Sequence, residues 1–144
     1  RVLDDAAVLG AGGRAAEALL PLARADGWLP GRFAADWSGA VAGSCLAGEA
    51  QMANNWMRLH LITGEDRWLE PVPRVLAFLK RTQNRGSADP GLRGGIKGSA
   101  PMSGGYGQHE ILNWATKYFA DALMRHGQLA RGTARDRSSA YRLA

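Results

Sequence analysis

Two glycine-rich stretches, each followed by a segment with the apolar spacing of a helix, constrain the fold of this chain most. The first, residues 27–43, mixes glycine and proline with aromatic residues. The second, residues 84–109, puts seven glycines into the seventeen positions from Gly91 to Gly107. Glycine clusters of this kind mark loops rather than regular elements. The core must therefore come from the helices that lie between and after these loops.

The apolar periodicity and the terminating residues predict four helical segments. They cover residues 14–25, 44–63, 66–83 and 110–126. Ser44 is the expected N-cap of the second segment, and Gly64 is its expected C-terminal stop. Pro21 is expected to kink or interrupt the first segment. Asp66 is placed to cap the third.

The order of the segments predicts an all-α fold of antiparallel helical hairpins. One domain covers residues 1–126, and residues 127–144 form a basic, flexible tail. The loops before Ser44 and before Glu110 look equivalent, as in one and a half copies of a unit of roughly 65 residues. The chain is too short for twelve helices of about 11–12 residues with their loops. Because it also begins with Arg1 rather than Met, we expect a fragment of a larger protein.

From Trp28 to Met124 the chain resembles the α/α-toroid proteins, which include terpenoid cyclases, protein prenyltransferases and six-hairpin glycosidases. The segments that carry the resemblance are GWLPGRFAADWSG, SCLAGEAQMANNWMRLHLITGEDRWLEPVPRVLAFLKRTQ and GLRGGIKGSAPMSGGYGQHEILNWATKYFADALM. The pattern is most similar to bacterial toroid proteins associated with exopolysaccharide genes. The resemblance implies the C-terminal part of a toroid, with glycine-rich loops at one rim. None of the segments is a catalytic signature, and a fold alone does not fix a function.

The distribution of charge argues against nucleic acid as a partner. The net charge is +5, but residues 127–144 hold four arginines against one aspartate, which leaves +2 for the rest. No apolar run is long enough to span a membrane, and we expect no cofactor. Cys45 is the only cysteine, so the redox compartment is undetermined, although a cytoplasmic location is favoured. A homo-oligomer or the remainder of a parent chain is a further candidate partner.

The segment 44–63 carries an unusual polar face. Gln51, Asn54, Asn55 and Arg58 share one side at 100° per residue. A solvated helix normally carries charged residues, whereas amides beside an arginine suit a cavity that binds hydroxyl-rich ligands such as sugars. The alternative is an ordinary solvated face, or amides that satisfy loop backbone.

The two loops supply the other candidate ligand-binding residues. Trp37 is the best stacking platform for a sugar ring or an isoprenoid chain. Lys97, Tyr106 and His109 come from the second loop. By contrast, we expect three other tryptophans to lie in the core: Trp56, Trp68 and Trp114.

Acid–base chemistry would need a pair of carboxyls, and Asp36 with Glu110 is the candidate catalytic pair, since both would lie at one rim. Glu49 and Asp121 are further candidates. Glycoside cleavage generally needs two carboxyls about 5–10 Å apart. The alternative is that Asp36 caps a turn and that Glu110 favours a helix start through the dipole.

Two weaker patterns lack residues that their sites require. Cys45 and His109 could face one rim as zinc ligands, but Gly43 stands where prenyltransferases carry an aspartate, and catalytic zinc wants three protein ligands. We therefore expect no metal. The glycines of residues 10–13 imitate a dinucleotide fingerprint, but the flanking strands and the acidic residue are missing.

Three hypotheses for function follow, and they leave open whether the chain is an enzyme. The first is a toroid domain that binds or processes a carbohydrate. The second is an isoprenoid-handling domain, which predicts an aromatic, mostly apolar cavity. The third is a non-enzymatic helical scaffold or interaction domain, which predicts a large exposed apolar patch along an open edge.

Overall fold

The computed structural model describes the backbone of residues 6–140 and the side chains of residues 6–132. Four α-helices dominate it: α1 (Ala6–Leu19), α2 (Leu46–Thr63), α3 (Val72–Thr82) and α4 (Asn113–Ala140). Two short 3₁₀ helices, Leu20–Leu22 and Asp66–Leu69, follow α1 and precede α3. Four two-residue strands complete the described part: β1 (Ser44–Cys45), β2 (Ile96–Lys97), β3 (Ser99–Ala100) and β4 (Ile111–Leu112). The chain is therefore mostly helical, as predicted, with small sheets that the all-α expectation did not include.

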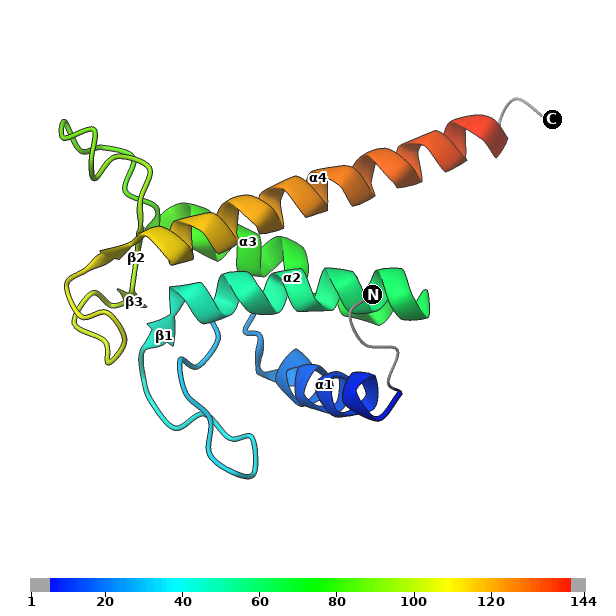
Figure 1. Cartoon of the computed structure of the whole chain (residues 1–144), viewed down its shortest axis with the longest axis horizontal. Coiled ribbons are helices and arrows are strands. Elements are labelled where there is room, and N and C mark those ends of the chain that lie inside the picture. The colour runs from blue at the N-terminus through cyan, green and yellow to red at the C-terminus, as the bar shows by residue number, and fades with distance from the viewer. Residues whose placement is uncertain (1–5, 141–144) are drawn as a thin grey trace.

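The four strands form two small antiparallel sheets that bring the starts of α2 and α4 together. Strand β1 pairs with β3, with Ser44 opposite Ala100, and β2 pairs with β4, with Ile96 opposite Leu112. Because β1 leads directly into α2 and β4 leads directly into α4, the loop that carries β2 and β3 fixes where both helices begin. The strands and long loops gather at this end of the molecule, and α2 and α4 run from it in the same direction (Figure 1).

Gly98 lies between β2 and β3 and joins both sheets. Its N–H donates to the carbonyl of Glu110, and its own carbonyl accepts from the N–H of Leu46. A Cβ atom at this position would lie 2.5 Å from the carbonyl oxygens of Tyr106 and Gly107. Only glycine allows the backbone to approach this closely, so the glycine-rich sequence is a packing requirement here.

The core lies between α2 and the three other helices. Ala50 and Ala53 of α2 are fully buried, as are Ala115 and Ala122 of α4, and the two helices pack against each other. Small side chains allow helices to pack closely. The helix α3 contributes a buried stripe: Val72, Val75, Leu76 and Leu79. Trp56 is fully buried, and its Nε1 donates to the carbonyl of Ala16 at 3.0 Å. This bond fixes α1 against α2.

Several predicted boundaries are confirmed. Gly64 ends α2 in the left-handed conformation at φ 75°, which glycine adopts without strain. The first helix stops just before Pro21. The third ends at Thr82, with Gln83 as its C-cap. The strand-then-helix starts at Ser44 and Ile111 lie 67 residues apart (44 to 111), in keeping with the predicted repeat.

Other boundaries were wrong. Ser44 belongs to β1 and does not cap α2; Cys45 does, because its Sγ accepts from the N–H of Gly48 at 3.4 Å. Asp66 begins a 3₁₀ turn, and the N-cap of α3 is Pro71. The last helix does not end near residue 126 but continues to Ala140, so much of the predicted tail is helical. Residues 141–144 of that tail lie outside the described residues.

The first helix begins at Ala6, well before the predicted start at residue 14. Gly10, Gly12 and Gly13 therefore lie inside α1. A dinucleotide-binding loop needs a turn between a strand and a helix. The resemblance to that fingerprint has no structural counterpart here.

Candidate functional site

A polar cleft runs between α2 and α4 and unites the predicted ligand-binding face of α2 with a matching face of α4. Its volume is about 360 Å³, within the usual range for ligand sites. The lining residues of the polar cleft are Gln51, Asn54, Asn55, Arg58, Lys117, Tyr118 and Asp121. All four polar residues singled out on the segment 44–63 therefore lie in one cavity.

The spacing of the residues explains why the cleft is polar on both walls. On α2 the lining positions are 51, 54, 55 and 58, and on α4 they are 117, 118 and 121. Residues three, four and seven apart share one face of a helix. Because α2 and α4 start side by side and run in the same direction (Figure 1), these two faces meet along the cleft.

Asn54 holds the two walls together. It is buried, and its Nδ2 donates to the carbonyls of Ala50 and Tyr118, each at 3.0 Å. Its Oδ1 accepts from Nε of Arg125 at 3.3 Å. The amide that was predicted to bind ligand thus has its polar atoms engaged between the helices. We infer that Asn54 positions the cleft walls.

The three other polar side chains that α2 contributes to the polar cleft are free to bind. Gln51, Asn55 and Arg58 are exposed, and in the part of the chain that the structure describes they have no hydrogen-bond or ion-pair partner. Opposite them, Lys117 forms an ion pair with Asp121 at 2.6 Å, and its ammonium lies 4.9 Å from the ring centre of Tyr118. The cleft therefore offers amide donors and acceptors, a free guanidinium and one paired carboxylate.

An exposed aromatic pair continues the α4 wall toward the loops. Trp114 lies three and seven residues before Lys117 and Asp121, so it shares their helix face. Its indole Nε1 donates to the hydroxyl of Tyr106 at 3.0 Å. Trp114 is 47% exposed and Tyr106 is 43% exposed. The prediction that Trp114 lies in the core is wrong, whereas Trp56 and Trp68 are buried as expected. Trp114 shares a helix face with the charged residues Lys117 and Asp121, and this spacing was the signal that could have identified it as a surface residue.

A smaller cavity lies among the loops at the end where α2 begins. This rim cavity has a volume of about 140 Å³, below the usual size of a ligand site. Its lining residues are Gly31, Arg32, Val41, Gly43, Ser44, Cys45, Ser99, Gly105 and Tyr106. Burial raises the pKa of the Cys45 thiol against the opposing effect of the hydrogen bond from the N–H of Gly48. Of the residues expected to converge at the rim, Cys45 and Tyr106 do so.

The remaining rim candidates line neither the polar cleft nor the rim cavity. Trp37 is 43% exposed and has φ 67°, in a loop closed by a bridge between Phe33 and Gly39. Lys97 lies in β2, where it pairs with Ile111. His109 has φ 59°, and its N–H donates to the carbonyl of Met102. Their binding roles stay predictions.

The candidate catalytic carboxyls also lie outside both cavities. Asp36 Oδ1 accepts from the hydroxyl of Ser38 at 2.6 Å and from its N–H at 2.9 Å. These bonds lower the pKa of Asp36, whereas a general acid needs a raised pKa. Glu110 is exposed, and its backbone bonds to Gly98 and Gly107. A turn role therefore accounts for Asp36, and its catalytic role with Glu110 stays untested.

Glu49 is the carboxyl with the most perturbed environment. It is 2% exposed, and burial raises the pKa of its carboxyl to about 8 against the opposing effect of hydrogen bonds from Ser44 and Leu29. Its Oε1 accepts from the N–H of Leu29 at 2.9 Å and from the hydroxyl of Ser44. Among the described residues, Oε2 has no partner. Glu49 ties the first loop to α2 and lines neither cavity.

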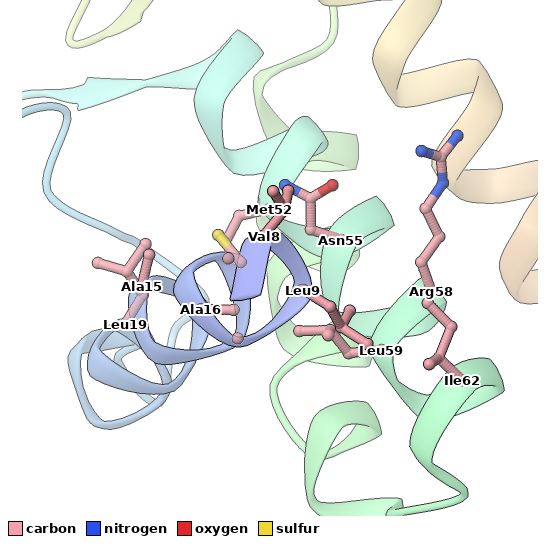
Figure 2. A pocket seen from close by; sticks show the side chains of 12 residues that line it. Val8, Leu9, Ala15, Ala16, Leu19, Met52, Asn55, Arg58, Leu59 and Ile62 are labelled. Atoms are coloured by element: carbon pink, nitrogen blue, oxygen red, sulfur yellow. The ribbon is translucent and has the colours of Figure 1, made fainter. Parts of the chain in front are cut away.

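An apolar groove lies on the other side of α2, between α2 and α1 (Figure 2). Its volume is about 440 Å³. The lining residues of the apolar groove are Val8, Leu9, Gly12, Gly13, Ala15, Ala16, Leu19, Met52, Asn55, Arg58, Leu59 and Ile62. Two of these, Asn55 and Arg58, also line the polar cleft. The two cavities are therefore neighbours across one ridge of α2.

The described part of the chain contains neither a candidate cation site nor a candidate membrane span. No group of three His, Cys, Asp or Glu side chains is placed there to hold a metal ion. None of the described helices combines the length and the apolar character that crossing a membrane requires. Comparisons with models of known protein families, with curated proteins and with solved structures found no match. The geometry of the cavities is therefore the basis for any functional conclusion.

Proposed function

We propose that this chain is a saccharide-binding domain whose site is the polar cleft between α2 and α4. The observation that carries the proposal is the set of three exposed polar side chains, Gln51, Asn55 and Arg58, that face a shared cleft and have no partner among the residues that the structure describes. Amides and a guanidinium together donate to and accept from sugar hydroxyls. The exposed pair of Trp114 and Tyr106 supplies a flat surface beside the cleft for the face of a sugar ring.

The arrangement of the helices supports a toroid origin for this site. The neighbours α2 and α4 run in the same direction, whereas α1 and α3 run the opposite way (Figure 1). In a ring of helical hairpins the neighbouring inner helices also run in the same direction, and the outer helices run the opposite way. In a partial toroid of this kind the polar cleft would lie between two inner helices, where such rings hold their ligands.

Binding is better supported than cleavage. Among the described residues that line the cleft, Asp121 is the one carboxyl, and it is paired with Lys117. Hydrolysis of a glycosidic bond generally uses two carboxyls, one of them with a raised pKa. The isoprenoid alternative predicts an aromatic apolar cavity, but the described residues that line the apolar groove include no aromatic side chain.

The proposal is tested by nuclear magnetic resonance with a panel of neutral and acidic oligosaccharides. A bound saccharide should shift the side-chain amide signals of Gln51 and Asn55 and the indole signal of Trp114. Gln51→Ala should weaken binding about two- to tenfold, the usual value of one hydrogen bond. The matched control is Gln128→Ala, because Gln128 is an exposed amide of α4 that lies outside the cleft.

A second pair of variants separates the cleft from the rim. Trp114 and Trp37 have similar exposure, 47% and 43%, but only Trp114 lies on the cleft face of α4. Trp114→Ala should reduce affinity, and Trp37→Ala should leave it unchanged. If no oligosaccharide shifts the cleft signals, or if Trp37→Ala alone abolishes binding, the polar cleft is not the saccharide site.

A further inference from the structure

The polar cleft and the apolar groove meet at two side chains of α2. Asn55 and Arg58 line both cavities. In Figure 2 the guanidinium of Arg58 extends away from the apolar side chains, while Leu59 lies beside Leu9. Ile62 is a further lining residue of the groove. One ridge of α2 therefore separates a cavity rich in hydrogen-bonding groups from a cavity lined by aliphatic side chains.

The groove has the size of a small-molecule site. Its volume of about 440 Å³ falls within the range of ligand pockets, about 300–1,000 Å³. A methylene group needs about as much room as a water molecule, about 30 Å³. The groove can thus hold an aliphatic chain of roughly ten to fifteen carbons.

From this juxtaposition we infer that the ligand is an amphiphilic saccharide, with its sugar head in the polar cleft and its aliphatic chain in the apolar groove. The inference rests on the proposed function and adds the class of saccharide to it. Asn55 and Arg58 stand at the junction, where they can donate to the oxygens that link head and chain. A single ligand then buries the exposed apolar surface of Leu9 and Ile62 and satisfies the free polar groups beside it.

A second copy of the chain fits the groove less well. A stable protein interface buries about 800 Å² on each partner. Of the groove's lining residues, the large and exposed apolar ones are Val8, Leu9 and Ile62. Arg58 lies at the edge of the groove and has no ion-pair partner within the described part of the chain. In a dimer it would be placed against its own copy or against apolar surface. A polar head group next to a chain matches both sides of the ridge.

The test is a series of alkyl maltosides, from hexyl to dodecyl, each kept below its critical micelle concentration. Affinity should rise with chain length, by up to about fourfold for each methylene that is fully buried, and should level off when the groove is full. Maltose should bind more weakly than every member of the series. Signals of Leu9 and Ile62 methyl groups should shift only with the alkylated ligands.

Two neighbouring residues provide a matched pair of variants. Ile62 lines the groove and is 51% exposed, whereas Leu61 is 59% exposed and lies outside it. Ile62→Glu should flatten the dependence on chain length, and Leu61→Glu should leave it unchanged. Both positions are on the surface near the end of α2, so both variants should fold, which circular dichroism would verify.

The outcomes separate this inference from the proposed function. Equal affinity for maltose and decyl maltoside at the cleft overturns the inference and leaves saccharide binding intact. Equal affinity for decyl maltoside and decyl phosphocholine, with no effect of Gln51→Ala, overturns both. If no maltoside binds, the inference is wrong. A dimer that Ile62→Glu dissociates would assign the groove to a second copy and would also overturn the inference.

Discussion

The strongest structural prediction concerns Asn54, the buried amide that joins the two helices of the cleft. Replacing Asn54 with alanine removes two donated hydrogen bonds at 3.0 Å and one accepted from Arg125 at 3.3 Å. The two shorter bonds are worth about 1 kcal/mol each. The longer bond, to a half-buried arginine, adds about 0.5 kcal/mol. The net loss is about 2–3 kcal/mol before any change in helix propensity.

Asn55→Ala is the matched control for this measurement. Asn55 is the next residue of the same helix, but it is exposed and has no partner among the described residues. Alanine favours a helix over asparagine by about 0.5 kcal/mol at both positions. The difference between the two variants therefore cancels propensity and isolates the hydrogen bonds of Asn54.

Urea unfolding followed by circular dichroism would give both free energies. We expect Asn54→Ala to lower the free energy of unfolding by about 2–3 kcal/mol more than Asn55→Ala. Asn54→Ala should also weaken saccharide binding, because the cleft walls lose their link. A difference below about 0.5 kcal/mol, the usual scale of surface substitutions, would refute the view that Asn54 holds α2 against α4.

Two further predictions follow from Glu49 and Gly98. Because the pKa of Glu49 is raised to about 8 from 4.5, the folded state holds a proton that the unfolded state loses, so stability should fall by up to about 1.4 kcal/mol per pH unit between pH 4.5 and 8. Urea unfolding across this range should show a flatter profile for Glu49→Gln but not for exposed Glu70→Gln; an unchanged slope would contradict the burial of Glu49. Gly98→Ala would place a Cβ 2.5 Å from two carbonyl oxygens, whereas Gly105→Ala meets nothing within 4 Å. Thermal unfolding should show a loss of about 3 kcal/mol or more for the first and little change for the second, and equal melting temperatures would be the contrary result.

The sequence predicted much of the helical framework and one wall of the site. Gly64, Pro21 and Gln83 mark helix ends through local backbone preferences, which act wherever the chain folds. The polar face of α2 could be identified because residues three, four and seven apart lie together on any helix. The start of α2 was predicted wrongly because Ser44 pairs with Ala100 in a strand. This partner lies 56 residues away along the chain (44 to 100).

The opposite wall of the cleft required long-range packing. Trp114 is a residue type that is expected in a core, yet its side chain on α4 is exposed and donates a hydrogen bond to Tyr106. Asn54 has a polar side chain of the kind that binds ligands, yet its amide donates to the backbone of α4. Asp36 and Glu110, which share a rim in the predicted toroid, line neither cavity. The environment of Asn54 in particular depends on Tyr118, 64 residues away along the chain, whereas Asp36 bonds locally to Ser38.

By itself, then, the sequence determined a mostly helical chain, the ends of several helices and the amide-rich face of α2, because these depend on dihedral preferences and on the period of one helix. Only the tertiary structure decided that this face meets Lys117, Tyr118 and Asp121 across a cleft and adjoins an aliphatic groove against α1. The reason is physical: the pairing of β1 with β3 and of β2 with β4 sets where α2 and α4 start. That relative placement is a property of contacts between segments, which no single segment encodes.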